Sequence, residues 1–368
     1  MKIKKEKINA ALSFSLSLAL VVLTFVFSDE LGFVFRNLFK KSFSAGESIG
    51  EYINTPKKNN ADADEKTKAV IGFGSGKKSE ESETDIPSDI KKLMKDAEKM
   101  YSGFEKTAEL QEIALGSSNA NTKYGKVAIN NKTDRKPDVK ALLKETPAFG
   151  KITKNEPYIL IYHTHTTEGY ELLDKGWYSK DYDSRTEDVS KTVVRVGDEI
   201  ATELTKAGFK VIHDKTVYDR SYNGAYSRSL VTVEKYLKEY PSIVLTLDVH
   251  RDAIHYDSGV KCKPTAVING KKAAQVMIIT GCEYDGVEDF PDWEKNLTFA
   301  VALQNSVEEN YEGLMRPIFF CGRKYNMNVT PCSLLLEFGT DANTLDEAVY
   351  SGRLVGKSLA KLLNDNIN

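Results

Sequence analysis

The sequence predicts an α/β fold, with a mainly parallel, twisted sheet flanked by helices, in the C-terminal part of the chain. Two observations predict this fold. First, short apolar runs of strand length alternate with longer segments in which apolar side chains recur every three or four residues. Second, these runs lack the polar alternation of a strand with one face in water, which indicates burial on both faces. Such alternation is typical of a parallel sheet with helices on both sides.

The predicted strands are apolar, and helical segments separate the first three of them. Strands are expected at residues 158–162, 209–212, 242–249, 317–320 and 333–338. Helices are expected at residues 189–207, 226–240 and 297–311. Gly208 and Pro241 end the first two helices, because glycine suits the left-handed end of a helix and proline cannot continue one.

Two further local signals complete the predicted fold. Asn269 and Gly270 lie between two apolar segments, and this pair favours the tight turn of a β-hairpin, which we expect at one edge of the sheet. Thr344 and Glu347 have the spacing of a capping box, in which each residue satisfies a backbone N–H of the first helical turn. A final helix is therefore expected to begin there.

The N-terminal segment predicts a membrane anchor. Residues 8–27 are uncharged and mostly apolar, which matches the roughly 20 residues needed to cross a bilayer. The run ends in Ser28, Asp29 and Glu30 rather than in the small residues of a signal-peptide cleavage site, so we expect an uncleaved anchor. The short basic head is expected to stay in the cytoplasm, which places the rest of the chain outside the cytoplasmic membrane.

Three regions are therefore expected. Residues 1–28 form the cytoplasmic head and transmembrane anchor, residues 29–136 an extracytoplasmic tether, and residues 137–368 the folded domain. The tether is rich in Ser, Asn, Lys, Glu and Gly, and such segments cannot bury enough apolar area to offset chain entropy. We expect it to be largely disordered, with one helical piece at residues 89–115.

Composition excludes one class of partner. The formal net charge of −2 provides no basic excess that would follow a phosphate backbone, so no nucleic acid partner is expected. The cysteines contain no pair with two-residue spacing, which argues against a structural zinc knuckle. They are Cys262, Cys282, Cys321 and Cys332.

Three of the predicted strands carry or lead into residues that can bind metals or transfer protons. These residues are His163, His165, Glu168, His250 and Glu337. In open α/β sheets, sites form outside the carboxyl ends of the strands. Residues far apart in the sequence are therefore expected to converge in one crevice.

The types of residue predict a catalytic zinc site. His165, Glu168 and His250 would supply two imidazoles and one carboxylate, and would leave a fourth position of the metal open for water. A hydrolytic site of this kind also needs a carboxylate that takes a proton from water and passes it to the leaving amine. Glu337 is expected to fill this role, because an idle carboxylate within an apolar strand would be costly.

Two alternatives to these ligands stay open. His163 follows the same strand as His165, so it is an alternative metal ligand, or a contact to the ligands or the substrate. Glu187 lies just before the first predicted helix and is an alternative to Glu168 as the carboxylate ligand. A carboxylate that only stabilises the helix N-terminus is the simpler interpretation of Glu187.

The two residues that follow His250 are also candidate site residues. Arg251 and Asp252 follow His250 in the sequence. They could orient its imidazole or hold a substrate carboxylate, and a structural ion pair is the alternative.

Several segments resemble the stage II sporulation protein P family of endospore-forming bacteria. The resemblance extends from about residue 137 to the carboxyl end, and the HTHTTE and DVHRDA pieces are its most specific parts. The similar segments are YHTHTTEGY, VVRVGDE, KAGFKVIHD, PSIVLTLDVHRDA and YNMNVTPCSLLLEFGTDANTLDEA.

The resemblance implies a fold and an activity. Members of this family resemble zinc-dependent N-acetylmuramoyl-L-alanine amidases and zinc carboxypeptidases in fold, and cut the amide between muramic acid and L-alanine as well as peptide cross-links. They act on peptidoglycan from the membrane that engulfs the forespore, together with partner proteins D and M. The implied zinc site comprises His165 or His163 with Glu168 and His250, and Glu337 is the implied acid/base. The wider superfamily has its carboxylate ligand before the first helix, which keeps Glu187 as an alternative.

Two other functions remain as hypotheses. A zinc carboxypeptidase acting on stem peptides would need an arginine for the terminal carboxylate, for which Arg251, Arg316 and Arg323 are candidates. A noncatalytic wall-binding scaffold would need no proton-transfer carboxylate, so Glu337 separates it from an enzyme.

Overall fold

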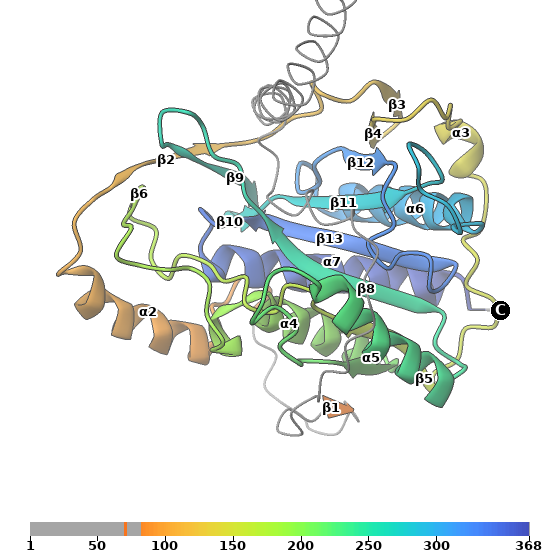
Figure 1. Ribbon diagram of the computed structural model, residues 1–368, viewed down its shortest axis with the longest axis horizontal. Helices are drawn as coiled ribbons and strands as arrows, with labels where there is room; N and C mark the ends of the chain where they lie inside the picture. The colour runs from red at the N-terminus through yellow and green to blue at the C-terminus, as the bar shows by residue number, and fades with distance from the viewer. Residues whose placement is uncertain (1–69, 72–81, 368) are drawn as a thin grey trace, which may run out of the picture. The chain divides into compact units, whose positions relative to one another are not determined.

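The structure of the protein is a computed structural model, which describes residues 70–71 and 82–367 (Figure 1). Two sheets form its framework. The larger sheet contains, in spatial order, β1 (Val70–Ile71), β7 (Lys210–His213), β5 (Pro157–Tyr162), β8 (Leu245–Asp252), β13 (Cys332–Thr340), β11 (Val276–Gly281), β12 (Ile318–Cys321), β4 (Val127–Asn131) and β3 (Thr122–Tyr124). The smaller sheet contains β10 (Lys271–Ala274), β9 (Lys261–Ile268), β2 (Ala108–Ile113) and β6 (Trp177–Tyr178).

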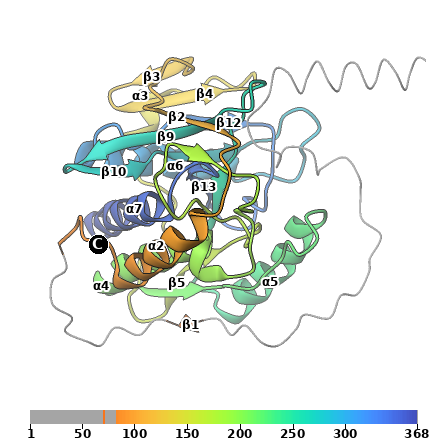
Figure 2. The same ribbon diagram turned by 90° about the vertical axis from the view of Figure 1, so that its left-hand side faces the viewer.

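Helices cover both faces of the larger sheet. Helices α4, α6 and α7 share one hydrophobic cluster on one face, and α5 packs into another cluster on the opposite face (Figure 2). The described helices are α2 (Ser88–Tyr101), α3 (Val139–Leu142), η2 (Val189–Lys191), α4 (Val193–Lys206), α5 (Ala225–Glu239), α6 (Trp293–Asn310) and α7 (Leu345–Asp365).

Strand β5 shows how the sequence determines the two faces. Ile159 and Ile161 lie in the cluster that contains α4 and α7, whereas Leu160 and Tyr162 lie in the cluster that contains α5. Successive side chains of a strand point to opposite faces, so an unbroken apolar run fills both layers. The strand therefore needs no polar alternation.

The expected α/β fold is present, but its sheets are mixed rather than mainly parallel. Strands β7, β5, β8 and β13 are mutually parallel, whereas β11 pairs with β13 in the antiparallel direction. Strands β12 and β4 are parallel to β11, and β1 and β3 are antiparallel additions at the two edges. The expectation was wrong because apolar patterning predicts a strand without giving its direction.

The expected hairpin turn and final capping box are confirmed, but the hairpin lies in the smaller sheet rather than at an edge of the larger one. Asn269 and Gly270 form the turn between β9 and β10, and both have positive φ, which a tight hairpin turn requires. Helix α7 begins after Thr344, whose side chain accepts from the backbone N–H of Glu347, and Glu347 in turn accepts from Thr344.

The boundary expected at residue 137 lies inside the folded unit. Three strands precede this residue: β2 belongs to the smaller sheet, and β3 and β4 belong to the larger one. Helix α2 ends at Tyr101, so the helical piece expected at residues 89–115 is shorter than predicted. The remainder of the expected tether, before residue 82, lies outside the described residues except for β1.

The expected anchor at residues 8–27 also lies outside the described residues. Within the part of the chain that the structure describes, no helix combines the length and the apolar character needed to cross a bilayer.

Candidate active site

Polar residues in or directly after three central strands lie together at the carboxyl ends of those strands in the larger sheet. Strands β5, β8 and β13 are adjacent and parallel, so their carboxyl ends lie together. His165 and Glu168 lie in the turn that follows β5, His250 lies in β8, and Glu337 lies in β13. Their exposed fractions are only 0%, 5%, 2% and 5%, respectively. The structure thus brings together four residues that the sequence analysis singled out.

His250 lies between two carboxylates. Its Nδ1 is 3.2 Å from Glu168 Oε2, and its Nε2 is 2.8 Å from Asp248 Oδ1, although the second contact lacks the geometry of a hydrogen bond. Burial opposes protonation of this imidazole, but the two carboxylates outweigh it and raise the pKa of His250 well above its usual value. His250 thus lies in an environment that favours the protonated imidazole.

His165 is held mainly by aromatic rings. The ring of Tyr222 stacks on it at a centroid distance of 4.5 Å and an interplanar angle of 2°. Tyr226 and His250 make edge contacts with it. Among the described residues neither ring nitrogen of His165 has a hydrogen-bond partner, and its Nδ1 lies 3.8 Å from Asp219 Oδ2. Two unsatisfied nitrogens on a buried imidazole are costly and indicate a missing partner.

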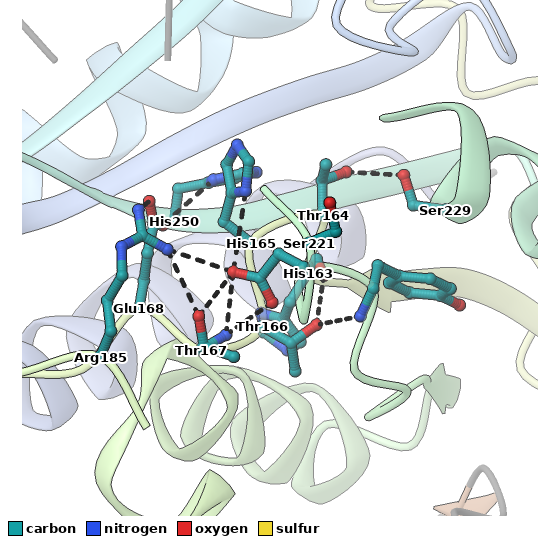
Figure 3. Close-up of polar contacts among 12 residues, drawn as sticks. His163, Thr164, His165, Thr166, Thr167, Glu168, Arg185, Ser221, Ser229 and His250 are labelled. Atoms are coloured by element: carbon teal, nitrogen blue, oxygen red, sulfur yellow. Dashed lines mark hydrogen bonds and ion pairs between the residues drawn. The ribbon is translucent and has the colours of Figure 1, made fainter. Parts of the chain in front are cut away.

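Glu168 makes polar contacts with three residues, and Figure 3 draws those with His250 and Arg185. Besides its contact to His250, it accepts from the backbone N–H of Arg251 at 3.2 Å and from Arg185 Nη2 at 3.4 Å. Burial opposes its ionisation, but the contact with His250 and nearby positive charges lower the pKa of Glu168 well below its usual value. The side chain is therefore an ionised carboxylate able to bind a cation.

Glu337 has the opposite electrostatic character. It is the register partner of His250 in the neighbouring strand, so both side chains lie on the same face of the sheet. Its Oε2 has no hydrogen-bond partner among the described residues. Burial and the nearby Asp252 raise the pKa of Glu337 well above its usual value. A carboxyl in this environment retains its proton readily.

His163 points away from this group of residues, into a second buried network. Its Nδ1 lies 2.9 Å from the carbonyl oxygen of Val249, and its Nε2 lies 2.8 Å from His213 Nε2. His213 in turn contacts Asp198 of α4. Both ring nitrogens of His163 thus have partners, which leaves none for a metal in this arrangement.

The remaining candidates, Glu187, Arg251 and Asp252, lie outside the group of proposed ligands or have structural partners. Glu187 is more than half exposed and pairs with Arg220, so it lies outside the buried group. Arg251 donates through Nε to the carbonyl oxygen of Gly169. Asp252 pairs with Arg316 at 2.9 Å. The two residues after His250 thus have structural partners.

The family model described as "Stage II sporulation protein P (SpoIIP)" matches residues 68–360 of this chain. The chain belongs to the stage II sporulation protein P family. Stage II sporulation protein P of Bacillus subtilis (strain 168) is 30% identical over 207 residues, which are 53% of this chain and 48% of that protein. The chain thus spans about half the length of the curated relative that it matches.

Solved amidase structures are among the proteins similar to this member of the stage II sporulation protein P family. The N-acetylmuramoyl-L-alanine amidase AmiC2 of Nostoc punctiforme has a TM-score of 0.31 and 13% identity, covering 59% of this chain and 97% of the amidase. The CwlD amidase of Clostridioides difficile, in complex with the GerS lipoprotein, has a TM-score of 0.33 and 12% identity, covering 57% and 100%.

Sequence reasoning missed three residues around this stage II sporulation protein P site. Asp248 could have been found, because it lies two residues before His250 on the same face of β8. Asp219 and Arg185 lie in loops that carry no periodic signal. Arg185 contacts both Asp219 and Glu168, at 3.2 Å and 3.4 Å.

The donor set suits a metal, although the described residues contain no group of three or more ligands already arranged around a metal position. His165 is buried with both ring nitrogens unsatisfied, and Glu168 is an ionised carboxylate beside His250. Two imidazoles and one carboxylate are a known donor set of catalytic zinc. The nitrogen of His250 that binds the metal would have to be unprotonated, because a metal and a proton compete for the same nitrogen.

Proposed function

We propose that this protein is a membrane-anchored peptidoglycan hydrolase that cleaves the amide between N-acetylmuramic acid and L-alanine, and also peptide cross-links, during engulfment of the forespore. Membership of the stage II sporulation protein P family supports the setting. The convergence of His165, Glu168, His250 and Glu337 is the observation that carries the proposed chemistry.

The proposed cofactor is one zinc ion, held by His165, Glu168 and His250. When bound, zinc supplies Lewis acidity and lowers the pKa of water in the site. The unsatisfied nitrogens of His165 support this assignment, because a buried imidazole needs a partner. Asp248 would retain its contact with Nε2 of His250, which leaves Nδ1 as the nitrogen that faces Glu168.

Glu337 is the proposed acid/base. A carboxyl with a raised pKa can take a proton from attacking water and donate it to the leaving amine nitrogen. Its register with His250 places the proton-transfer group and a proposed ligand on the same face of the sheet. Burial at 5% exposure keeps bulk water from competing for this proton.

The proposed location is the engulfing membrane, with the folded part outside the cytoplasm. The apolar segment at residues 8–27 supports this placement. Proteins D and M, which the family resemblance implies, are the proposed partners.

The carboxypeptidase alternative loses support, because its candidate arginines are engaged. Arg251 donates to a backbone carbonyl and Arg316 pairs with Asp252. Arg323 donates to the carbonyl oxygen of Gly322. A terminal substrate carboxylate would have to displace one of these contacts.

The test uses a chain that begins at Ser48, which retains every described residue, incubated with purified peptidoglycan. Released fragments are identified by mass spectrometry with and without a chelator, and with proteins D and M present or absent. Release of intact stem peptides that stops on chelation and returns with zinc supports the amidase. Release of single C-terminal residues would favour the carboxypeptidase. Binding to the wall without any cleavage, even with both partners, would favour a scaffold.

A further inference from the structure

Asp219 is a buried carboxylate that the proposed mechanism does not use. It lies in the loop between β7 and α5, and its side chain is fully buried. Burial of a charge is costly unless hydrogen bonds and opposite charges compensate it. Hydrogen-bond donors and positive charges must therefore compensate the buried charge of Asp219.

Two of the hydrogen-bond donors to Asp219 belong to Thr167, which lies in the turn after β5 that carries His165 and Glu168. Asp219 Oδ1 accepts from the backbone N–H of Thr167 at 3.1 Å, and Oδ2 accepts from the Thr167 hydroxyl at 2.6 Å. Arg185 donates to Oδ2 at 3.2 Å. Thr167 lies between His165 and Glu168 in the sequence, so Asp219 fixes the turn that carries both proposed ligands.

The same carboxylate faces one particular nitrogen of His165. The distance from Asp219 Oδ2 to Nδ1 is 3.8 Å, about 1 Å longer than a hydrogen bond. Tyr222 stacks in parallel on the imidazole and restricts the tilt of its ring. A small shift of either side chain would complete the bond from Nδ1 to Asp219.

His250 provides a precedent within the same molecule. Its Nε2 lies 2.8 Å from Asp248, a close contact without hydrogen-bond geometry, while its other nitrogen faces Glu168. Histidines that bind metals commonly donate their second ring N–H to a carboxylate, which fixes the tautomer and the ring orientation. Asp219 has the matching position for His165.

We propose that Asp219 is a positioning residue, which holds the proton of His165 on Nδ1 and so makes Nε2 the metal-binding nitrogen. This inference rests on the proposed zinc-dependent function. It pairs each proposed histidine ligand with its own aspartate, Asp219 with His165 and Asp248 with His250. A role in folding alone would affect the loop without affecting the tautomer.

The first measurement needs no variant at Asp219. Nitrogen NMR of the full-length protein in detergent, with ¹⁵N-labelled histidine and zinc added, reports which nitrogen of His165 is protonated. His165→Gln identifies the signals among those of the five histidines. Protonated Nδ1 and metal-bound Nε2 are expected, and the reverse pattern would overturn the proposal.

The second measurement compares zinc affinities by competition with a chromophoric chelator. Asp219→Asn is expected to weaken zinc binding about 10- to 100-fold, and Asp219→Glu to recover part of the loss. Asp214→Asn is the matched control, because Asp214 is buried in the same loop and accepts from Tyr218 and Thr216 instead. The control should keep the zinc affinity of the unchanged protein.

The possible outcomes distinguish a failure of the positioning role from a failure of the proposed zinc-dependent function. If Asp219→Asn binds zinc as tightly as the unchanged protein while zinc-dependent cleavage persists, the positioning role is wrong and the proposed function stands. If the unchanged protein binds no zinc, both are wrong.

Discussion

Glu337 is the residue on which the distinction between an enzyme and a binding protein depends. Glu337→Gln keeps the size of the side chain and removes its ability to transfer a proton. We expect turnover to fall by about 10²- to 10⁴-fold, because this is the usual contribution of a general acid/base. Zinc content, measured by metal analysis, should not change. A variant that retains full cleavage would exclude Glu337 from the chemistry.

Gly197 makes room for the buried histidine pair. A Cβ at this position of α4 would lie 2.7 Å from His213 Nε2 and 2.8 Å from His163 Cε1. Gly197→Ala is expected to destabilise the fold by about 1–3 kcal/mol through overpacking, although alanine is the better helix former. Urea denaturation measures the change. Gly116→Ala is the control, because nothing lies within 4 Å of its Cβ position, and it should have little effect.

The choice between His163 and His165 illustrates what the sequence could not decide. Both follow β5 and are two residues apart, so alternation along the strand would place them on the same face and cannot separate them. The turn after Tyr162 separates them instead: His163 contacts α4, and His165 contacts His250. The alternation of strands and helices along the sequence was enough to predict that the carboxyl ends of the strands would lie together. It was not enough for Asp219, because a loop residue obtains its position from tertiary contacts with Thr167 and Arg185.

At the scale of the element, the capping box of α7 offers a direct test. Thr344→Ala removes the acceptor for the N–H of Glu347, and is expected to cost about 1 kcal/mol of folding free energy. Thermal unfolding followed by circular dichroism checks this cost. Thr202→Ala in α4 is the matched control, because Thr202 is exposed and bonds only to the carbonyl of Asp198. Equal losses in both variants would argue against a capping role.

The elements differ in how readily they could be predicted. Strands β5, β8 and β13 each place several apolar side chains in the main hydrophobic cluster, and they were predicted from this patterning. Strand β2 lies within the helical piece predicted at residues 89–115 of the tether, and this prediction is wrong for residues 108–113. Its sequence AELQEI is polar and most of its side chains are exposed, so it carries no apolar strand pattern. Its place in the smaller sheet comes from backbone pairing with β9 and β6, which leaves little trace in side-chain composition.

At the scale of the whole molecule, the early strands are expected to be essential. A chain that begins at Lys136 lacks α2, β2, β3 and β4, which exposes edges of both sheets. We expect it to be poorly soluble and to melt at a lower temperature than a chain beginning at Ser48. Light scattering and calorimetry measure both properties. Identical melting of the two chains would show that these strands add nothing to stability.

Stability should also depend on pH through two oppositely shifted carboxyls. Burial raises the pKa of Glu171 to about 7, so its contribution is present below its unfolded value of 4.5 and disappears as the pH rises through 7. Hydrogen bonds from His213 and Lys215 outweigh burial and lower the pKa of Asp198 to about 2. Its contribution is present above the unfolded value of 3.8 and disappears as the pH falls toward 2.

The resulting prediction concerns the alkaline side of the stability profile. Glu171→Gln cannot ionise, so we expect its free energy of unfolding to fall less between pH 5 and 8 than that of the unchanged protein. Urea titrations at several pH values provide the measurement. Glu109→Gln, at an exposed position of β2, is the control and should leave the slope unchanged. A slope unaffected by Glu171→Gln would contradict the raised pKa.

The stack of Tyr222 on His165 affects when such a site could act. Tyr222 is half-buried, while its neighbours Ser221 and Asn223 are exposed. His165 beneath it has no contact with solvent. We therefore expect a polymer substrate to reach His165 only if side chains that cover it, Tyr222 among them, move. On this expectation, access to the carboxyl ends of the strands depends on the short loop that carries Tyr222.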